Sequence, residues 1–197
     1  MKTLFYAVLT TAIGCASTHA QQVEVAGGKV AGQPMADGSS LFYGIPYAAA
    51  PTGELRWKPP APRAAWSGVL DATNIAPACA QGDTGWNKGF LTTMREDCLT
   101  VSIRTPAATN NKARLPVLVY LHGGSNAYAG AGDMAEDALH REGIVLVKVQ
   151  YRLGAWGFLG LDALREESPQ RASGNYCLLY TSPSPRDRTR SRMPSSA

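Results

Sequence analysis

The feature of the sequence with the clearest chemical potential is a glycine turn that follows an apolar run. Residues 117–121 are Val-Leu-Val-Tyr-Leu, and His122-Gly123-Gly124-Ser125 come directly after them. Glycines have no side chain, so backbone N–H groups in such a turn can approach a ligand closely. At the carboxyl end of a buried strand, these groups can donate hydrogen bonds to an oxyanion that develops during acyl transfer. From these residues alone, a tight turn after a core strand is an equally good interpretation.

Two strands and a helix are expected to position this turn. The apolar runs at 117–121 and 144–149 predict buried strands, and the first lacks any polar alternation, as in a strand covered on both faces. Between them, residues 135–142 predict a helix that Asp133 would cap and Gly143 would end. A strand, a helix of about ten residues and a second strand make a parallel βαβ unit.

The earlier residues predict shorter β structure. Residues 23–25 and 29–31 flank a glycine turn and indicate a hairpin, and residues 99–103 alternate as a strand does. Residues 41–48 are interrupted by glycine and proline, which favours an irregular segment packed on the sheet. Residues 107–113 predict a polar turn. The expected fold class is α/β, with a mixed, mostly parallel sheet preceded by a β-hairpin.

The first twenty residues have the composition of a secretory signal peptide. Lys2 precedes an apolar stretch over 4–16, and small residues lead to a cleavage site expected after Ala20. The apolar stretch is too short to span a bilayer, so no stable membrane anchor is expected. A lipoprotein cleavage before Cys15 is less well supported, because Ala12 stands where a larger aliphatic residue is usual. The chain is therefore predicted to be secreted or periplasmic.

Residues 177–197 differ in composition from everything before them. They are rich in Pro, Ser and Arg and show no apolar periodicity after Tyr180. One interpretation is a disordered basic tail that binds nucleic acid or an acidic surface. The other is that residues 177–187 can be encoded by DNA that resembles a transposase adapter used to build sequencing libraries. On that hypothesis the native sequence ends near Tyr176 and the tail is a translated artefact, which codons unlike the adapter would contradict.

The basic charge of the chain comes from its two ends. The sequence has 19 Lys+Arg and 15 Asp+Glu, a formal net charge of +4. Without Lys2, the four arginines of the tail and Asp187, residues 21–176 hold 14 of each. The charge balance therefore gives no indication of a nucleic-acid partner, and none is expected.

Two cysteines, Cys79 and Cys98, remain once the predicted signal peptide and tail are set aside. An even pair in an exported chain favours a disulfide. Closing a loop of 18 intervening residues would contribute roughly 3 kcal/mol in the chain-entropy model. Two cysteines without nearby histidines lack the ligands of a metal site, so neither a metal nor a cofactor is expected.

Segments such as Glu96-Asp-Cys-Leu99 and His122-Gly-Gly124, taken in order along the chain, resemble the type-B carboxylesterase family, the cholinesterase-like branch of the α/β-hydrolases. They cover nearly all of 21–176, and Glu96-Asp-Cys-Leu99 is the most specific. Arg104 departs from the pattern, because the family usually has an apolar residue there. The matching segments are Phe42-Tyr-Gly-Ile-Pro-Tyr-Ala48, Gly53-Glu-Leu-Arg-Trp57, Glu96-Asp-Cys-Leu-Thr-Val-Ser-Ile103, His122-Gly-Gly124, Tyr151-Arg-Leu-Gly154, Gly157-Phe-Leu159 and Ser173-Gly-Asn-Tyr176.

The resemblance implies the N-terminal part of an α/β-hydrolase fold, with Cys79–Cys98 as the family's first disulfide and the glycine turn as its oxyanion hole. The family typically has three glycines after the histidine, and the second and third supply the N–H donors. Here those positions are Gly124 and Ser125. Ser125 keeps its N–H, but its side chain would crowd the turn or constrain its φ. Asn126 replaces a usual aromatic residue, which would alter the acyl pocket.

No catalytic triad can be assembled from this sequence. The family's nucleophile lies in a Gly-x-Ser-x-Gly pentapeptide, which occurs nowhere in the 197 residues. Of the three histidines, His19 lies in the signal peptide, His122 in the turn and His140 on the predicted helix, at the surface or half-buried. The prediction is an incomplete N-terminal fragment of a secreted serine carboxylic-ester hydrolase, inactive as written, whose parent acts on a small-molecule ester.

Two other interpretations remain open. The first is a non-catalytic, cholinesterase-like adhesion or binding module, which a downstream Gly-x-Ser-x-Gly would argue against. The second is a natural short secreted protein with a basic tail. Structural roles are expected for Trp86, as a cover for part of the core, and for Arg152, as a partner of Glu96 or Asp97. An incomplete sheet would leave central strands at an open edge.

Overall fold

The computed structural model describes residues 20–107, 114–132, 137–169 and 171–176 of the chain. Four predictions fall wholly or partly outside these residues. They are the signal peptide, most of the polar turn, the first part of the helix after the glycine turn, and the tail from residue 177. The predicted boundaries after residues 20 and 176 therefore stay predictions.

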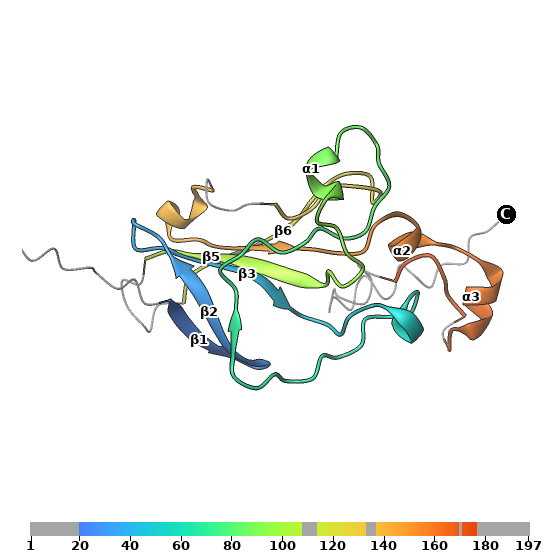
Figure 1. The fold of residues 1–197 in the computed structure, drawn as a ribbon, viewed down its shortest axis with the longest axis horizontal. Helices are drawn as coiled ribbons and strands as arrows, with labels where there is room; N and C mark the ends of the chain where they lie inside the picture. Colours follow the sequence, from blue (N-terminus) through green and yellow to red (C-terminus); the bar gives the residue numbers. More distant parts are fainter. Residues whose placement is uncertain (1–19, 108–113, 133–136, 170, 177–197) are drawn as a thin grey trace, which may run out of the picture.

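The described residues form a seven-stranded mixed sheet (Figure 1). Along its main path the strands lie in the order β1-β2-β3-β5-β7-β6, and β4 pairs with β2. Their bounds are β1 Gln21–Val25, β2 Gly28–Pro34, β3 Ser40–Pro46, β4 Val69–Asp71, β5 Thr100–Thr105, β6 Val117–Leu121 and β7 Val145–Val149.

The mixed character of the sheet is confirmed, but the expectation of mostly parallel pairing is wrong for the described residues. Four of the six ladders are antiparallel, and only β6–β7 and β2–β4 are parallel. Short connections account for the two antiparallel ladders at the start of the chain, β1–β2 and β2–β3. A two-residue or five-residue link can join antiparallel neighbours, whereas parallel neighbours need a crossover of about a dozen residues or more.

The strands at the start of the chain include one confirmed prediction and one correction. β1 and β2 form the predicted hairpin, with Val25 opposite Gly28. β3 is a strand and not an irregular segment, and it pairs with β5 on both sides of a register shift between Phe42 and Ile45. Gly44 lies in that bulge with φ +67°. The bulge lets β3 keep its sheet pairing despite the glycine that argued against a strand.

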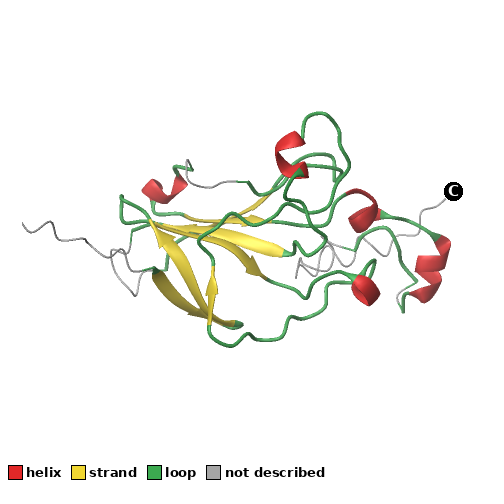
Figure 2. Cartoon of the chain, in the orientation of Figure 1, coloured by secondary structure: helices red, strands yellow, loops and turns green. Residues whose placement is uncertain are grey.

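β6 and β7 are parallel, as predicted, but β6 is exposed and not buried on both faces. Val117 and Val119 are each 60% exposed and Leu121 is 51% exposed. Among the described elements, β6 pairs with β7 alone and forms the edge of the sheet. Figure 2 shows the helices lying around the ends of the strands. An apolar strand is buried only where other elements cover it, and the described part of the chain contains no such cover for β6.

Within the described residues 137–142, the connection that leads into β7 ends in a 3₁₀ helix, η2 (Leu139–Glu142), where the sequence predicts an α-helix. Gly143 ends η2 with φ +73°, as predicted. The remaining helices are short: η1 Gly53–Leu55, α1 Lys88–Leu91, α2 Gly154–Phe158 and α3 Asp162–Glu167. None of the helices in the described ranges is long and apolar enough to span a bilayer.

The buried apolar residues form three clusters, and one of them supports the glycine turn. That cluster joins the two cysteines to residues that follow β3, precede β5 and follow β7: Ala48, Cys79, Cys98, Leu99, Tyr151 and Leu153. Leu153 and Leu99 are almost completely buried. The segments on either side of the turn in space are therefore anchored in a common core.

Candidate functional site

His122 is the first residue after β6, and it supports the turn as a buried aromatic. Its ring stacks on Tyr151, with centroids 4.3 Å apart and 16° between the planes. The Tyr151 hydroxyl donates to the His122 carbonyl oxygen. His122 Nδ1 lies 2.8 Å from the Gly123 carbonyl oxygen, which only accepts, so Nδ1 carries the proton. Burial lowers the pKa of His122, and the ring is therefore a neutral support at pH 7.

Gly124 is required by both the conformation and the space of the turn. Its φ is +110°, and a Cβ placed on it would overlap the carbonyl oxygen of Tyr128. Its own carbonyl oxygen accepts hydrogen bonds from the N–H groups of Ala127 at 2.9 Å and Tyr128 at 3.2 Å. Gly123, by contrast, has open space where a Cβ would lie. Only the second glycine is therefore strictly fixed by the structure.

Ser125 and Asn126 occupy the left-handed region, with φ of +54° and +59°. Such a conformation costs a non-glycine residue roughly 1–2 kcal/mol. The expectation that Ser125 constrains φ in the turn agrees with this observation, because the serine adopts a backbone conformation that favours glycine. Within the described residues, the N–H groups of Gly124 and Ser125 donate to no protein acceptor. The described part of the chain therefore does not use the hydrogen-bonding capacity of these two groups.

We expect Ser125→Gly to stabilise the chain. The substitution relieves the left-handed strain, while glycine adds freedom to the unfolded chain, so the net gain should be roughly 0.5–1 kcal/mol. Urea unfolding followed by circular dichroism measures it. Ser125→Ala keeps the strain and is the matched control. Equal stability of the glycine and alanine variants would contradict the assignment of strain to this residue.

The segment after β7 holds the turn from a second side. The Gly154 N–H donates to the Asn126 carbonyl oxygen at 2.7 Å. Arg152, buried beside it, donates to the carbonyl oxygens of Lys58 and Tyr176. The Tyr151-Arg-Leu-Gly154 segment thus contacts the glycine turn directly.

Glu96, one of the two carboxylates expected beside Arg152, forms a bidentate pair with Arg56, at 2.7 and 2.8 Å. The pairing of Arg152 with Glu96 or Asp97 stays a prediction. Trp57, next to Arg56, donates from Nε1 to the Ala155 carbonyl oxygen at 2.9 Å. This Arg-Trp pair therefore ties the long loop after β3 both to the disulfide loop and to α2.

The cysteines of the disulfide loop belong to the core cluster that supports the glycine turn. Cys79 and Cys98 are disulfide-bonded with an S–S distance of 2.02 Å, which fits the expected pairing. The Ala80 N–H donates to the Arg95 carbonyl oxygen at 2.9 Å, so the base of the loop is also closed by backbone bonds. Trp86 lies inside this loop and is 89% exposed. The expectation that it covers part of the core is therefore wrong.

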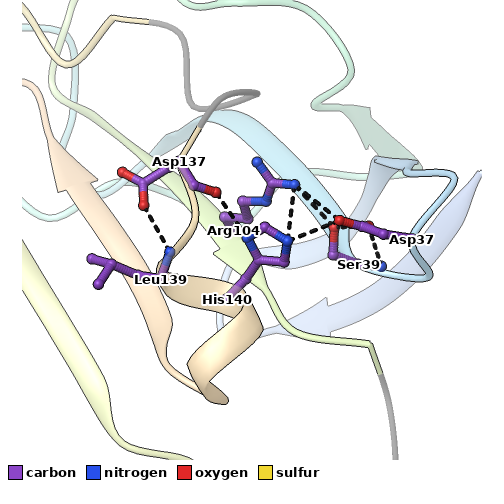
Figure 3. Close-up of polar contacts among 6 residues, drawn as sticks. All are labelled: Asp37, Ser39, Arg104, Asp137, Leu139 and His140. Atoms are coloured by element: carbon purple, nitrogen blue, oxygen red, sulfur yellow. Dashed lines mark hydrogen bonds and ion pairs between the residues drawn. The ribbon is translucent and has the colours of Figure 1, made fainter.

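A second group of polar residues lies away from the turn, against η2 (Figure 3). His140 Nε2 lies 2.8 Å from Asp37 Oδ2, and the Ser39 hydroxyl donates to Asp37 Oδ1. Arg104 Nη2 lies 3.2 Å from His140 Nε2 and 3.4 Å from Asp37 Oδ2. This Asp37–Arg104–His140 cluster is not a triad, because the serine donates to the carboxylate and not to the imidazole. His140 therefore cannot take the proton from Ser39.

The position of this cluster corrects one prediction and explains another. His140 is buried, with 6% exposed, and not at the surface or half-buried. Arg104 is 3% exposed and lies in the sheet between Leu41 of β3 and Leu146 of β7. It therefore does occupy an apolar environment, as the family pattern implies. Asp37 and His140 supply the polar partners that make the arginine tolerable there.

The same cluster should make stability depend on acidic pH. Hydrogen bonds from Ser39 are the main cause that holds the pKa of Asp37 well below its usual range, and the bond from His140 adds to them. A carboxyl whose folded pKa is depressed adds stability above its unfolded pKa, near 3.8, and loses it as pH falls further. At neutral pH, the urea concentration at the midpoint of unfolding should therefore be higher for wild type than for Asp37→Asn. The difference between the two midpoints should become smaller towards pH 3. A constant gap would contradict this assignment.

Sequence reasoning missed the residues that hold the turn. These are Tyr151 against the His122 ring and the buried carboxamides of Gln81 and Asn87 in the disulfide loop. The only local signal for the polar cluster was Arg104 in an otherwise apolar strand. Within the described residues, no group of three or more His, Cys, Asp or Glu side chains lies in an arrangement that would hold a metal ion.

The fold and the turn together define the class of the protein. The structure is similar to the carboxylesterase of Geobacillus stearothermophilus, with a TM-score of 0.67 and 32% identity over 79% of this chain and 31% of that one. It is equally similar to a thermophilic pNB esterase, with a TM-score of 0.67 and 32% identity over 79% of this chain and 32% of that one. The sheet is thus the N-terminal part of an α/β-hydrolase fold. The carboxylesterase family model matches residues 19–180, and the chain belongs to the carboxylesterase family.

Curated relatives lead to the same family. The chain is 41% identical over 141 residues to a fumonisin B1 esterase of Sphingopyxis macrogoltabida, which covers 70% of this chain and 26% of the relative. It is 39% identical over 179 residues to carboxylesterase 1F of Mus musculus, which covers 80% of this chain and 31% of the relative. The chain therefore spans between a quarter and a third of the length of these relatives.

Proposed function

We propose that residues 21–176 form the N-terminal part of a serine carboxylic-ester hydrolase, in which the N–H groups of Gly124 and Ser125 belong to the oxyanion hole. The observation that carries the proposal is the turn itself. It lies at the carboxyl end of β6, a strand parallel to its neighbour, and its two N–H groups have no acceptor within the described residues. Ligands of open α/β sheets bind at this end of the strands.

The proposed reaction proceeds through an acyl-enzyme. A serine from a part of the parent protein beyond residue 176 attacks the carbonyl carbon of a small-molecule ester, and the carbonyl oxygen becomes an anion. The two N–H groups donate to that anion, and each donor lowers the barrier by roughly 3 kcal/mol. A general base of the parent protein takes the serine's proton and gives it to the alcohol, which leaves. Water then attacks the acyl-enzyme, and the carboxylic acid is released with the serine regenerated.

The alternative is a non-catalytic, cholinesterase-like adhesion or binding module. The free donors of the turn favour the enzyme, because a module that forms no oxyanion has no use for them. The two functions are separated by the residues that follow 176 in the parent protein. A Gly-x-Ser-x-Gly pentapeptide there supports the hydrolase, and another residue in place of its serine supports the module.

Export and the origin of the tail belong to the same proposal. A signal peptide over residues 1–20, cleaved after Ala20, would deliver the protein to the periplasm or the medium. N-terminal sequencing of the exported protein should then begin at Gln21, and a retained Met1 would argue against it. The tail 177–197 is tested by sequencing the coding DNA, where codons unlike the adapter would make the tail native.

We expect the 197-residue chain by itself to hydrolyse no ester above the background rate. Its sequence contains no Gly-x-Ser-x-Gly, and Ser39, beside the Asp37–His140 pair, donates to the carboxylate and not to the imidazole. Release of p-nitrophenol from p-nitrophenyl acetate measures the activity, with the urea-unfolded chain as the blank for non-specific esterolysis. Turnover by the folded chain that exceeds this blank would contradict the prediction.

A further inference from the structure

A single buried side chain, Gln81, joins the disulfide loop to the glycine turn. Its Nε2 donates to the carbonyl oxygens of Ala129 at 2.9 Å and Cys79 at 3.0 Å. Its Oε1 accepts from the Ala129 N–H at 2.8 Å and from Asn87 Nδ2 at 2.9 Å. Both donors and both lone pairs of the carboxamide are therefore used. Only 2% of the residue is exposed.

The carboxamide forms hydrogen bonds with both the N–H and the carbonyl group of Ala129. This residue has φ +94°, a conformation that alanine rarely adopts. Strained backbone of this kind persists only where its surroundings hold it in place. Ala129 directly follows Tyr128, whose carbonyl oxygen occupies the space beside Gly124 and whose N–H donates to the Gly124 carbonyl oxygen. The two bonds from Gln81 thus fix the exit of the turn that carries the proposed oxyanion donors.

The other end of the connection is also held rigidly. Gln81 lies two residues after Cys79, where the disulfide and the backbone bonds to Arg95 close the loop. Asn87, which is 2% exposed, donates to the Gly82 carbonyl oxygen at 2.7 Å and accepts from the Thr84 N–H at 3.0 Å. The position of the Gln81 carboxamide is therefore fixed by the disulfide loop, and this in turn fixes its hydrogen bonds to Ala129.

We propose that Gln81 is a positioning residue, whose carboxamide transmits the conformation of the disulfide loop to the turn over residues 123–129. The catalytic importance of this contact rests on the proposed function of the turn. The contact itself does not, because it sets a backbone conformation that can be observed in the 197-residue chain without any reaction.

The test compares two nearly isosteric replacements in the ¹⁵N-labelled full chain. Gln81→Met removes every polar contact at Ala129. Gln81→Glu keeps the shape, and its protonated acid again presents one donor and one acceptor, while its carboxylate repels the Ala129 carbonyl oxygen. Burial raises the pKa of a carboxyl, so the acid should form within about pH 5 to 8. Gln33→Glu, at an exposed position of β2, is the matched control.

We expect the turn conformation to change between about pH 5 and pH 8 in the Gln81→Glu variant only. At about pH 8 the amide signals of Gly124, Ser125 and Ala129 should be displaced in both Gln81 variants, and exchange at Ala129 should be roughly 10-fold faster than in wild type. At about pH 5 the Gln81→Glu variant alone should return towards the wild-type spectrum. If Gln81→Met does not fold, recovery of the folded spectrum by Gln81→Glu at about pH 5 supports the proposal equally.

Two outcomes would overturn the proposal. One is a Gln81→Met spectrum in which these turn amides coincide with wild type. The other is a Gln81→Glu variant whose turn amide signals stay displaced at both pH values, or that is unfolded at both. The same conclusion follows if its amide signals change with pH no more than those of Gln33→Glu. Because the readout is the conformation of the turn, such a failure counts against Gln81 and not against the oxyanion role. A longer, complete enzyme without esterase activity would count against that role alone.

Discussion

Gly124→Ala is expected to be the most damaging single substitution in the turn. Alanine at φ +110° is strained, and its Cβ would overlap the Tyr128 carbonyl oxygen, which belongs to backbone and cannot swing aside. Strain and overpacking each cost about 1–3 kcal/mol, so the free energy of unfolding should fall by roughly 3 kcal/mol. Urea unfolding monitored by circular dichroism measures the change.

Gly123→Ala is the matched control for this prediction. No heavy atom lies within 4 Å of a Cβ at Gly123, and its φ is not in the positive range. Its loss of stability should stay within about 0.5 kcal/mol, as for other surface substitutions. Equal losses for the two glycines would show that the turn does not have the described conformation. In a complete enzyme, Gly124→Ala keeps the N–H but displaces it from the hole, which should lower kcat roughly 100–1000-fold.

Replacing both cysteines by serine, as Cys79→Ser with Cys98→Ser, should lower the free energy of unfolding by about 3 kcal/mol. The bond closes a loop with a sequence separation of 19, and both cysteines belong to the core cluster that supports the turn. Each residue is 1% exposed, so the two serine hydroxyls would also be poorly solvated. The urea midpoint of the variant, compared with that of oxidised wild type, measures the loss.

Reduced wild type is the control for the cysteine pair. If the covalent bond carries the effect, the urea midpoint of wild type in dithiothreitol should fall most of the way to that of the double serine variant. The midpoint of wild type taken through the same steps without dithiothreitol should not change. An unchanged midpoint after complete reduction, verified by thiol titration, would mean that packing and the backbone bonds to Arg95 hold the loop without the bond.

The strands were predictable where their side chains follow a local pattern. The hairpin of β1 and β2, strand β5 and the parallel pair β6 and β7 all follow from apolar runs and glycine turns. The burial of β6 was not predictable, because exposure depends on which other elements cover a strand. β3 was missed because a bulge at Gly44 allows a glycine-interrupted segment to remain in the sheet. Short links explain the antiparallel ladders β1–β2 and β2–β3. The ladders β3–β5 and β5–β7 join strands that lie far apart in the sequence, and no local pattern specifies such partners.

The candidate site was predictable in its residue types and not in its support. The order of histidine, glycines and Ser125 identified the turn, and the family resemblance assigned its role. The contact of Gln81 with Ala129 joins positions 48 residues apart, and Arg104 lies 67 residues from Asp37 and 36 from His140. Contacts at such separations leave no periodicity in the sequence. Only the unusual arginine in an apolar strand pointed to the polar cluster.

Ester hydrolysis by the uninterrupted chain tests the central proposal most directly. The reading frame of the source genome would be followed past codon 176, and the complete protein would be assayed with p-nitrophenyl acetate beside the 197-residue chain and the complete Gly124→Ala variant. We predict hydrolysis by the complete protein, none above the blank by the 197-residue chain, and a loss of roughly 100-fold or more in the variant. A complete, folded protein that hydrolyses no ester would contradict the account and favour the binding module.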